Sequence, residues 1–425
     1  MLRIYDDIAQ ARRVLLQRRQ EVTQQVAQDV ARILQEVQQE KDAALCRLLE
    51  VYDGVKITPD RLRVSEEEIA AAEWQVEEEF KKAIEVACRN ILAYHRRQLS
   101  NSWFSTGSQG EFLGQLVTPL ARVGIYVPGG KASYPSSVLM NALPARVAGV
   151  AEVVMVTPPR PDGTVNPYVL YAAARAGVSE IYRVGGAQAI AALAYGTPSI
   201  RRVDKITGPG NIYVTLAKQQ VYGIVDIDML AGPSEVLVVA DDSAPAAYVA
   251  ADLLAQAEHD QLASAVLITT SRRLARQVQQ ELEKQLSLLS RREIAAQALA
   301  NQGAIVLVDS LDAALQLANE LAPEHLELMV EDSLAWLGRV RCAGAVFLGP
   351  YSPEPLGDYL AGPNHVLPTG GTARFYSPLG VDSFLKRTSV ISYTPEAFRQ
   401  VAGAAVTLAS VEGLDAHAAS IKVRL

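Results

Sequence analysis

The chain has 425 residues, of which 49% are hydrophobic, and its net charge is −7 with acidic and basic residues interspersed. This length suffices for two or more globular domains, and this apolar content suffices for their cores. Because no basic surface or polybasic segment is present, the composition argues against nucleic-acid binding and membrane attachment and favours small-molecule chemistry.

The cysteines and the first residues predict where the protein works. Cys46, Cys88 and Cys342 are far apart, form no C-x-x-C pair and leave an odd thiol in any disulfide scheme. The N-terminal segment is too charged for a signal peptide, and no run approaches the roughly 18 apolar residues of a transmembrane helix. We therefore expect a cytoplasmic protein that is neither exported nor inserted in a membrane.

Residues 1–100 are expected to be helical and structural. Ser65-Glu-Glu-Glu68 has the form of a capping box that opens a helix. An apolar period of 3.6 residues precedes it, carried by Val26, Val30, Ile33, Leu34 and Val37.

From about residue 120, short β-branched runs alternate with alanine-rich helical segments. This alternation indicates βαβ units and a mainly parallel sheet with helices on both faces. The seven expected strands are "RVGIYV", "EVVMVT", "EIYRVG", "EVLVVA", "AVLITT", "AIVLVD" and "AVFLG".

Seven such strands exceed what one small doubly wound sheet needs, so we expect two α/β domains. The turn-rich stretches Val127-Pro-Gly-Gly130 and Ala231-Gly-Pro-Ser234 are the candidate crossings between them. The predicted division is an N-terminal helical arm (1–23), a discontinuous first α/β domain (24–123 and 236–379), a second α/β domain (124–235) and a small C-terminal module (380–425).

The histidines are the most informative candidates for catalytic or metal-binding residues, because the chain has only five. His95 fits an ordinary helix position, whereas the other four lie among polar residues that catalyse or bind metal elsewhere. Gln256 and His259, in "AQAEHD", would share one face of a helix and could offer a metal an amide oxygen and an imidazole nitrogen. By themselves they fit the polar edge of a helix at least as well.

In "NELAPEHLELMV", Pro323 fits the first position of a helix, with Glu324 and His325 in its first turn. The positive end of a helix disfavours imidazolium, so a neutral His325 could accept a proton and Glu324 could activate a water. A capping glutamate beside a half-buried histidine explains the same residues equally well.

"GDYLAGPNHVLPTGG" is expected to be a long irregular loop, and such loops are usually functional. Asp358 could be an oxygen ligand of a metal, while His365 could do no more than hydrogen-bond the loop backbone. Glu412 and His417 lie in the C-terminal module, where a solvated helix face accounts for them as well.

No G-x-G-x-x-G fingerprint follows a strand. "RVGGAQAIAALA" and "ITGPGNIYVTLA" each combine a strand end, a glycine turn and a helix start, where backbone N–H groups suit a phosphate. A plain βα turn explains each of them equally well.

Taken together, eight stretches resemble the blocks of the histidinol dehydrogenase family in the family's order, from about residue 120 to the C-terminus. They are "GIYVPGGKASYPSSVLMNALPA", "GGAQAIAALAYGT", "ITGPGNIYV", "DMLAGPSEVLV", "LLAQAEHD", "APEHLEL", "GDYLAGPNHVLPTGGTARF" and "EGLDAHAAS". Eight ordered blocks are far more specific than any single motif.

The resemblance implies oxidation of L-histidinol through L-histidinaldehyde to L-histidine with two NAD⁺, at the end of histidine biosynthesis, by a zinc-dependent homodimer. It implies Glu324 and His325 as the catalytic pair. The implied metal ligands are Gln256, His259, Asp358 and His417. The implied substrate contacts are Ser234, Gln256, His259, His325, Asp358, Glu412 and His417. The implied nucleotide contacts are Tyr126, Gln188 and Asn211.

The implied fold is a pair of incomplete, Rossmann-like three-layer α/β domains similar to aldehyde dehydrogenases, with a helical N-terminal part, a small C-terminal module and arms that exchange between subunits. Glu412 and His417 would then complete the site of the partner subunit.

Three rival interpretations stay open. An aldehyde dehydrogenase relative would need a positioned nucleophilic cysteine, and none of the three cysteines lies in a glycine-rich or polar block of that kind. A related zinc- and NAD-dependent alcohol dehydrogenase would act on another substrate. A silent metal- or nucleotide-binding regulator would have no need of Glu324 and His325.

Overall fold

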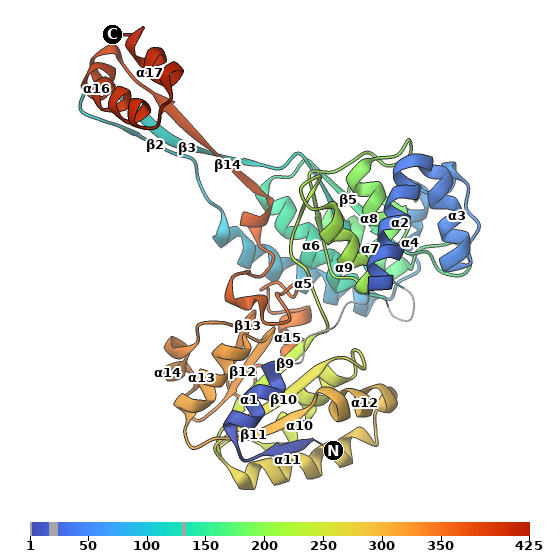
Figure 1. Ribbon diagram of the computed structural model, residues 1–425. Helices are drawn as coiled ribbons and strands as arrows, with labels where there is room; N and C mark the ends of the chain where they lie inside the picture. Colours follow the sequence, from blue (N-terminus) through green and yellow to red (C-terminus); the bar gives the residue numbers. More distant parts are fainter. Residues whose placement is uncertain (1, 17–23, 130–132) are drawn as a thin grey trace.

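The computed structural model describes residues 2–16, 24–129 and 133–425. Two α/β units lie one beside the other, and an arm that ends in two helices projects from the body (Figure 1). The termini lie far apart, with the N-terminus in one unit and the C-terminus at the tip of the arm.

The first unit is built on a six-stranded, all-parallel sheet with the order β1-β11-β10-β9-β12-β13. Its strands are β1 (Arg3–Tyr5), β9 (Glu235–Ala240), β10 (Ser264–Thr269), β11 (Ala304–Leu307), β12 (His325–Met329) and β13 (Ala345–Leu348). Two hydrophobic clusters sandwich the sheet, and each is shared with the helices of one face. One face is covered by α10 (Ala246–Ala257), α11 (Arg272–Leu286) and α12 (Arg292–Gln302), and the other by α1 (Ile8–Leu16) and α13 (Leu311–Leu321).

The second unit is built on a five-stranded parallel sheet with the order β6-β5-β4-β7-β8. Its strands are β4 (Arg122–Tyr126), β5 (Glu152–Thr157), β6 (Glu180–Arg183), β7 (Lys205–Thr207) and β8 (Asp226–Ile227). One face carries α4 (Glu66–Ala72), α5 (Glu78–His95), α6 (Pro135–Ala148) and α7 (Pro167–Ala176). The other carries α2 (Gln24–Glu40), α3 (Asp42–Asp53), α8 (Gly186–Tyr195) and α9 (Ile212–Val221). Both units therefore have three layers.

Outside the arm, the remaining elements are short. They are α14 (Ser333–Trp336), α15 (Glu354–Tyr359) and the 3₁₀ turns η1 (Pro59–Arg61), η2 (Arg96–Gln98), η3 (Leu337–Arg339), η4 (Thr372–Arg374) and η5 (Val381–Phe384).

The predicted fold class is confirmed, and each of the seven expected runs contains a strand. The apolar stripe of α2 is buried against the second unit, because its 3.6-residue period puts those side chains on one face. The capping box is also present: Glu68 N donates to Ser65 Oγ at 3.2 Å, and Ser65 N donates to Glu68 Oε2 at 3.0 Å.

The grouping of the domains differs from the sequence-based division. Residues 24–123 pack on the five-stranded sheet, because the clusters formed by α2 to α5 include the side chains of β4, β5 and β6. Val127 to Gly129 form a loop within this unit, between β4 and α6, while Gly130 lies outside the described residues. After β8 the chain does cross from the five-stranded to the six-stranded sheet, at the expected stretch of residues 231–234. We therefore propose that residues 24–102 and 120–234 form one unit.

The N-terminus is likewise not only helical. Arg3–Tyr5 is a strand that pairs in parallel with β11, because Leu2 and Tyr5 bury their side chains in the first unit. Part of the expected arm, residues 17–23, lies outside the described residues.

The arm combines two distant parts of the chain. Strands β2 (Trp103–Thr106), β3 (Phe112–Pro119) and β14 (Leu385–Ser392) form an antiparallel sheet that leads to α16 (Pro395–Val411) and α17 (Asp415–Lys422) (Figure 1). The expected C-terminal module therefore also uses residues 103–119, since β14 pairs with β3 along its whole length.

Of the described helices, none combines the length and apolar content that crossing a membrane requires. Cys46, Cys88 and Cys342 are free thiols.

Candidate active site

The predicted catalytic and metal-binding residues of the body gather at the amino edge of the six-stranded sheet. His325 is the first residue of β12 and lies opposite Val236 of β9. Gln256 and His259 lie at the end of α10, which returns from the carboxyl edge to the amino edge as βαβ geometry requires. Ligands of open α/β sheets usually bind at the carboxyl edge, so this arrangement is unusual.

The expectation that Glu324 and His325 open a helix is wrong. Helix α13 ends at Leu321 with Ala322 in a left-handed conformation, and β12 begins directly at His325. The chain is extended here because Glu324 O and the strand after it pair with β13. Burial, rather than a helix dipole, must therefore set the charge of this pair.

His325 is held as a neutral base. Burial lowers the pKa of its imidazole to about 3. Its Nδ1 lies 3.0 Å from Glu235 O and donates to it, which leaves Nε2 with a free lone pair. Nε2 is buried, and the described residues offer it no hydrogen-bond partner. An unprotonated imidazole nitrogen in this state can accept a proton.

Glu324 lies beside the imidazole. Its Oε2 accepts a hydrogen bond from Glu235 N at 2.9 Å and lies 3.7 Å from His325 Nδ1. Burial raises the pKa of the Glu324 carboxyl well above its usual range, and the negative charges of Glu235 and Asp358 raise it further. A carboxyl tuned upward in this way is suited to proton transfer near neutral pH.

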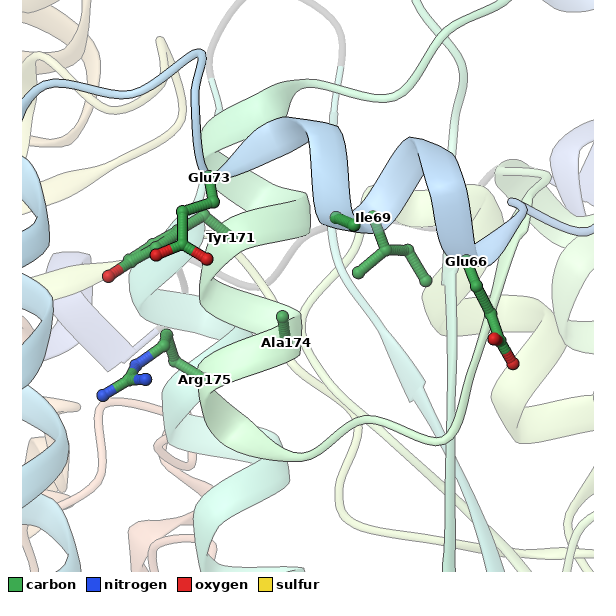
Figure 2. A pocket seen from close by; sticks show the side chains of 7 residues that line it. Glu66, Ile69, Glu73, Tyr171, Ala174 and Arg175 are labelled. Carbon is green, nitrogen blue, oxygen red and sulfur yellow. The ribbon is translucent and has the colours of Figure 1, made fainter.

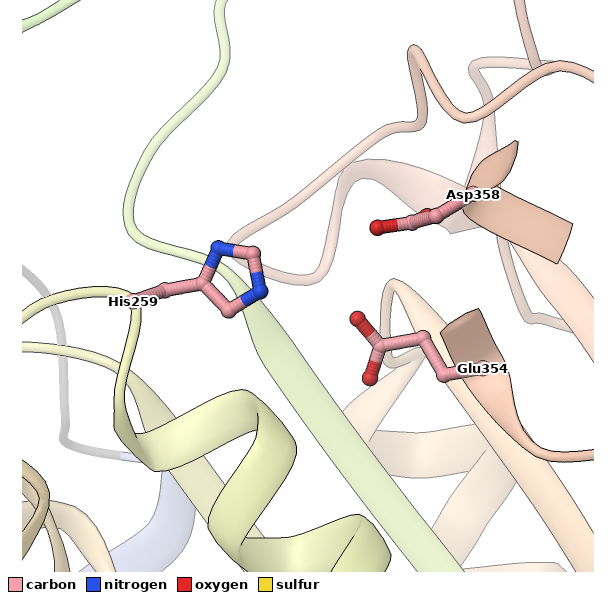
Figure 3. A group of neighbouring side chains, drawn as sticks. All are labelled: His259, Glu354 and Asp358. Carbon is pink, nitrogen blue, oxygen red and sulfur yellow. The ribbon is translucent and has the colours of Figure 1, made fainter. Parts of the chain in front are cut away.

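Three side chains converge on a possible metal position (Figure 3). One ligand atom from each of His259, Glu354 and Asp358 lies within 4.8 Å of the others. His259 comes from the turn after α10, while Glu354 and Asp358 are one helical turn apart on α15. The expected loop therefore begins only after a short helix, and Asp358 lies within that helix.

Gln256 completes this group. The end of its amide lies 2.9 and 3.2 Å from the two carboxylate oxygens of Glu354, with the nitrogen donating when it faces them. Burial raises the pKa of Asp358 to about 6 and that of Glu354 well above its usual range. Buried carboxylates this close together favour a cation, and the donors present are ones that zinc accepts. The residues therefore fit a zinc ion.

Sequence reasoning missed Glu354. Glu354 lies between two prolines in "SPEPLGDYL", just before the stretch expected to be a loop, so its i, i+4 relation to Asp358 was not considered. Pro355, the second residue of α15, was the available signal, because proline is tolerated in the first turn of a helix.

His365 contacts the helix that carries Asp358. Its Nδ1 lies 3.1 Å from Asp358 O, and its Nε2 lies 3.4 Å from Ser137 Oγ in α6. Burial lowers the pKa of the imidazole to about 4. His365 thus hydrogen-bonds the backbone of α15, rather than the loop alone, and connects the two units through Ser137.

Within one chain, Glu412 and His417 lie far in space from the group formed by Gln256, His259, Glu354 and Asp358. Both are exposed on the arm, Glu412 at the end of α16 and His417 on α17, and the arm points away from the six-stranded sheet (Figure 1). Within one chain the structure brings together three of the four predicted metal ligands.

The predicted nucleotide contacts lie at the carboxyl edge of the five-stranded sheet. Tyr126 ends β4, Gln188 is in the first turn of α8, and Asn211 is the N-cap of α9 after β7. Tyr126 Oη accepts from Gly186 N at 3.1 Å, and Asn211 Oδ1 accepts from two backbone N–H groups of α9. The strand order reverses between β4 and β7, which is the topological switch point where α/β sheets bind ligands.

Ser234, a predicted substrate contact, ends the segment that crosses between the sheets and directly precedes β9. It is adjacent to Glu235, whose backbone N–H and carbonyl contact Glu324 and His325.

Two hollows differ in whether they contain predicted site residues. A cavity of about 830 Å³ is lined by His325, Asp358 and His365 together with parts of β13 and of the loop after α15. A smaller hollow of about 200 Å³, between α4 and α7, is lined by Glu66, Ile69, Ala70, Glu73, Tyr171, Ala174 and Arg175 (Figure 2). Only the first contains predicted site residues.

Comparison with known proteins gives consistent results. The family model of histidinol dehydrogenase matches residues 16–425. The histidinol dehydrogenase of Moorella thermoacetica is 60% identical over 399 residues, covering 94% of each chain, and that of Heliobacterium mobile is 58% identical over 400 residues, also covering 94% of each. The crystal structure of histidinol dehydrogenase from Elizabethkingia anophelis has a TM-score of 0.95 at 38% identity, covering 100% of this chain and 98% of the other.

The structure has two α/β units with parallel sheets. A neutral imidazole beside side chains that could hold a metal ion, and glycine turns at the edge of the other sheet, fit an α/β enzyme of the oxidoreductase class. The family match extends over almost the whole length of the chain and agrees with this class. The chain belongs to the histidinol dehydrogenase family.

Proposed function

We propose that the protein oxidises L-histidinol through L-histidinaldehyde to L-histidine, with two NAD⁺ per substrate. The observation that carries this proposal is the buried Nε2 of His325, which has no hydrogen-bond partner among the described residues, beside the group formed by Gln256, His259 and Asp358. A base next to metal ligands is what an alcohol oxidation needs, because the hydroxyl must be held while it loses its proton.

Gln256, His259 and Asp358, with His417 from a second copy of the chain, would hold the zinc. When bound, zinc supplies a Lewis acid that fixes the imidazole and the amine of histidinol. Ser234 and Glu412 would add substrate contacts. Tyr126, Gln188 and Asn211 would hold NAD⁺, which supplies the hydride acceptor.

In the first oxidation, His325 accepts the hydroxyl proton through Nε2 while the carbon gives up a hydride. Glu324 then takes a proton from a water, whose oxygen adds to the aldehyde carbon, while Nε2 of His325 returns its proton to the carbonyl oxygen to complete the hydrate. In the second oxidation, His325 again accepts a hydroxyl proton as the second hydride leaves. The sum is an alcohol and a water converted to a carboxylic acid, with two hydrides transferred.

Exposed apolar side chains support a homodimer in which arms are exchanged. Leu408 and Val411 of α16 are 66% and 82% exposed, next to Glu412 and His417. Large apolar side chains grouped on one element mark an interface. We propose that a second copy covers them, that its arm completes the site, and that the enzyme works in the cytoplasm.

A second candidate is an enzyme that oxidises another amino alcohol with zinc and NAD⁺. The test compares NAD⁺ reduction by zinc-loaded protein on L-histidinol and on L-leucinol, an amino alcohol without an imidazole. We expect turnover only on L-histidinol. Equal turnover on both would favour the second candidate, and turnover on neither would refute the proposed chemistry.

A further inference from the structure

A buried ion pair lies outside the proposed chemistry. Lys218 of α9 and Asp228, just after β8, contact each other through Nζ and Oδ1 with side chains only 2% and 1% exposed. Moving two charges out of water costs several kcal/mol, and apolar residues of similar volume often stabilise a fold at least as well. The pair therefore calls for an explanation other than stability.

The pair holds both backbone polar groups of one residue. Asp228 Oδ2 accepts from Gly208 N at 2.7 Å, and Lys218 Nζ donates to Gly208 O at 3.0 Å. Gly208 has a φ of +111°, and a Cβ there would lie 2.2 Å from Tyr126 O. The turn at Gly208 thus packs closely against the end of β4, and the charged side chains of Lys218 and Asp228 hydrogen-bond its backbone.

Gly208 begins the turn that leads from β7 to Asn211, the N-cap of α9. The ion pair therefore connects two of the three predicted nucleotide contacts, Tyr126 and Asn211. Asp228 Oδ1 also accepts from Met229 N at 2.7 Å, where the chain starts its crossing to Ser234 and the other unit. One carboxylate thereby fixes the turn and the start of the crossing segment.

We propose that Lys218 and Asp228 are positioning residues that set the turn of residues 208–211 for NAD⁺ binding. The inference rests on the proposed nucleotide site at this edge. Backbone groups and an N-cap side chain bind a ligand well only if they are held in place beforehand, because a small displacement costs affinity. Charged hydrogen bonds to both sides of Gly208 hold the turn more firmly than neutral ones would.

A second lysine–aspartate pair, Lys205 of β7 and Asp226 of β8, provides the control. Lys205 Nζ lies 2.8 Å from Asp226 Oδ2 and donates to Ser383 O. Lys205 is at the amino end of β7, whereas Gly208 follows the carboxyl end. Removing this pair also removes a largely buried lysine, but at the edge away from the predicted nucleotide contacts.

The experiment compares Lys218→Met, Asp228→Asn, Lys218→Arg and Lys205→Met in the full-length, zinc-loaded protein. NAD⁺ affinity is measured by titration, KM and kcat by turnover of L-histidinol, and the melting temperature by calorimetry. We expect the first two variants to raise the Kd and KM for NAD⁺ about tenfold, the cost of an unsatisfied buried group. Zinc content, KM for L-histidinol and kcat at saturating NAD⁺ should stay near wild type, and Lys218→Arg should restore most of the affinity.

Lys205→Met should lower the melting temperature without changing the Kd for NAD⁺. A wild-type Kd in Asp228→Asn, which keeps the side-chain volume and an acceptor oxygen, would overturn the proposal, and so would an equal rise in Lys205→Met. Should Lys218→Met fail to fold, Asp228→Asn decides alone. A wild-type protein that neither binds NAD⁺ nor oxidises L-histidinol would instead refute the proposed function.

Discussion

Asp358 lies one helical turn after Glu354 on α15, and both carboxylates face the imidazole of His259 (Figure 3). Glu354 also lies within hydrogen-bond distance of the Gln256 amide. When the Gln256 nitrogen donates to Glu354, its oxygen is left for a metal. We therefore infer that Glu354 orients Gln256, a proposed metal ligand.

Replacing Glu354 tests this role. We expect Glu354→Gln to weaken zinc binding about tenfold, because outer residues that orient a ligand contribute 10- to 100-fold to affinity. Chelator competition measures the zinc Kd. Glu258→Gln, one residue before His259, is the control and should bind zinc normally; a wild-type Kd in Glu354→Gln would contradict the role.

The division between binding and catalysis predicts two different losses. His259→Ala should lose zinc and turnover together, since His259 offers a ligand atom. His325→Ala should keep zinc but lower kcat by about 100-fold or more, the usual contribution of a general base. Metal analysis beside steady-state kinetics separates the two, and equal zinc content in both variants would disprove the division.

His365 predicts a pH dependence of stability in the zinc-free protein. Its folded pKa of about 4 lies below the usual 6.5, so the unfolded chain binds the extra proton first as the pH falls. His365 therefore does not lower the free energy of unfolding above pH 6.5. Between pH 6.5 and about 4 it lowers that free energy by up to about 3 kcal/mol. Denaturant unfolding at several pH values should show a smaller loss in His365→Asn. Parallel curves for the two proteins would contradict this prediction.

The exchanged arm predicts complementation between inactive subunits. His417→Ala and His259→Ala should each be inactive, but a mixed dimer would contain one complete site. Co-refolding equal amounts should restore about a quarter of wild-type activity, because half of the dimers are mixed and half of their sites are intact. No recovery in a sample with demonstrated mixed dimers would mean that each arm serves its own subunit.

Cys342 tests the cysteine-dependent rival. Its backbone N–H donates to Asn319 Oδ1, and it is not among the residues that line the cavity beside His325. Cys342→Ser should therefore keep wild-type kcat on L-histidinol. A complete loss of turnover with intact folding would favour a thiohemiacetal mechanism.

The buried β-branched runs of the chain were sufficient to predict seven strands and the fold class, because strands covered on both faces are almost continuously apolar. Strand β12 was missed because it is not continuously apolar. Glu324, His325 and Glu327 are polar, and Pro323 suggested a helix start. Their burial in the sheet comes from pairing with β9 and β13, which local sequence does not show.

The grouping of residues 24–123 could not be predicted either. An amphipathic helix such as α2 shows which face it buries but not which sheet covers that face. For the site, Gln256, His259 and Asp358 were identified by resemblance to a family, whereas their meeting with Glu354 depends on the packing of α10 against α15.

The stoichiometry of the reaction shows whether the protein carries out both oxidations of L-histidinol. Zinc-loaded protein is given a limiting amount of L-histidinol with excess NAD⁺, and NADH and L-histidine are quantified at completion. We expect two NADH and one L-histidine per L-histidinol, with loss of activity after chelation. One NADH with free aldehyde in solution, or no NADH from metal-replete protein, would contradict it.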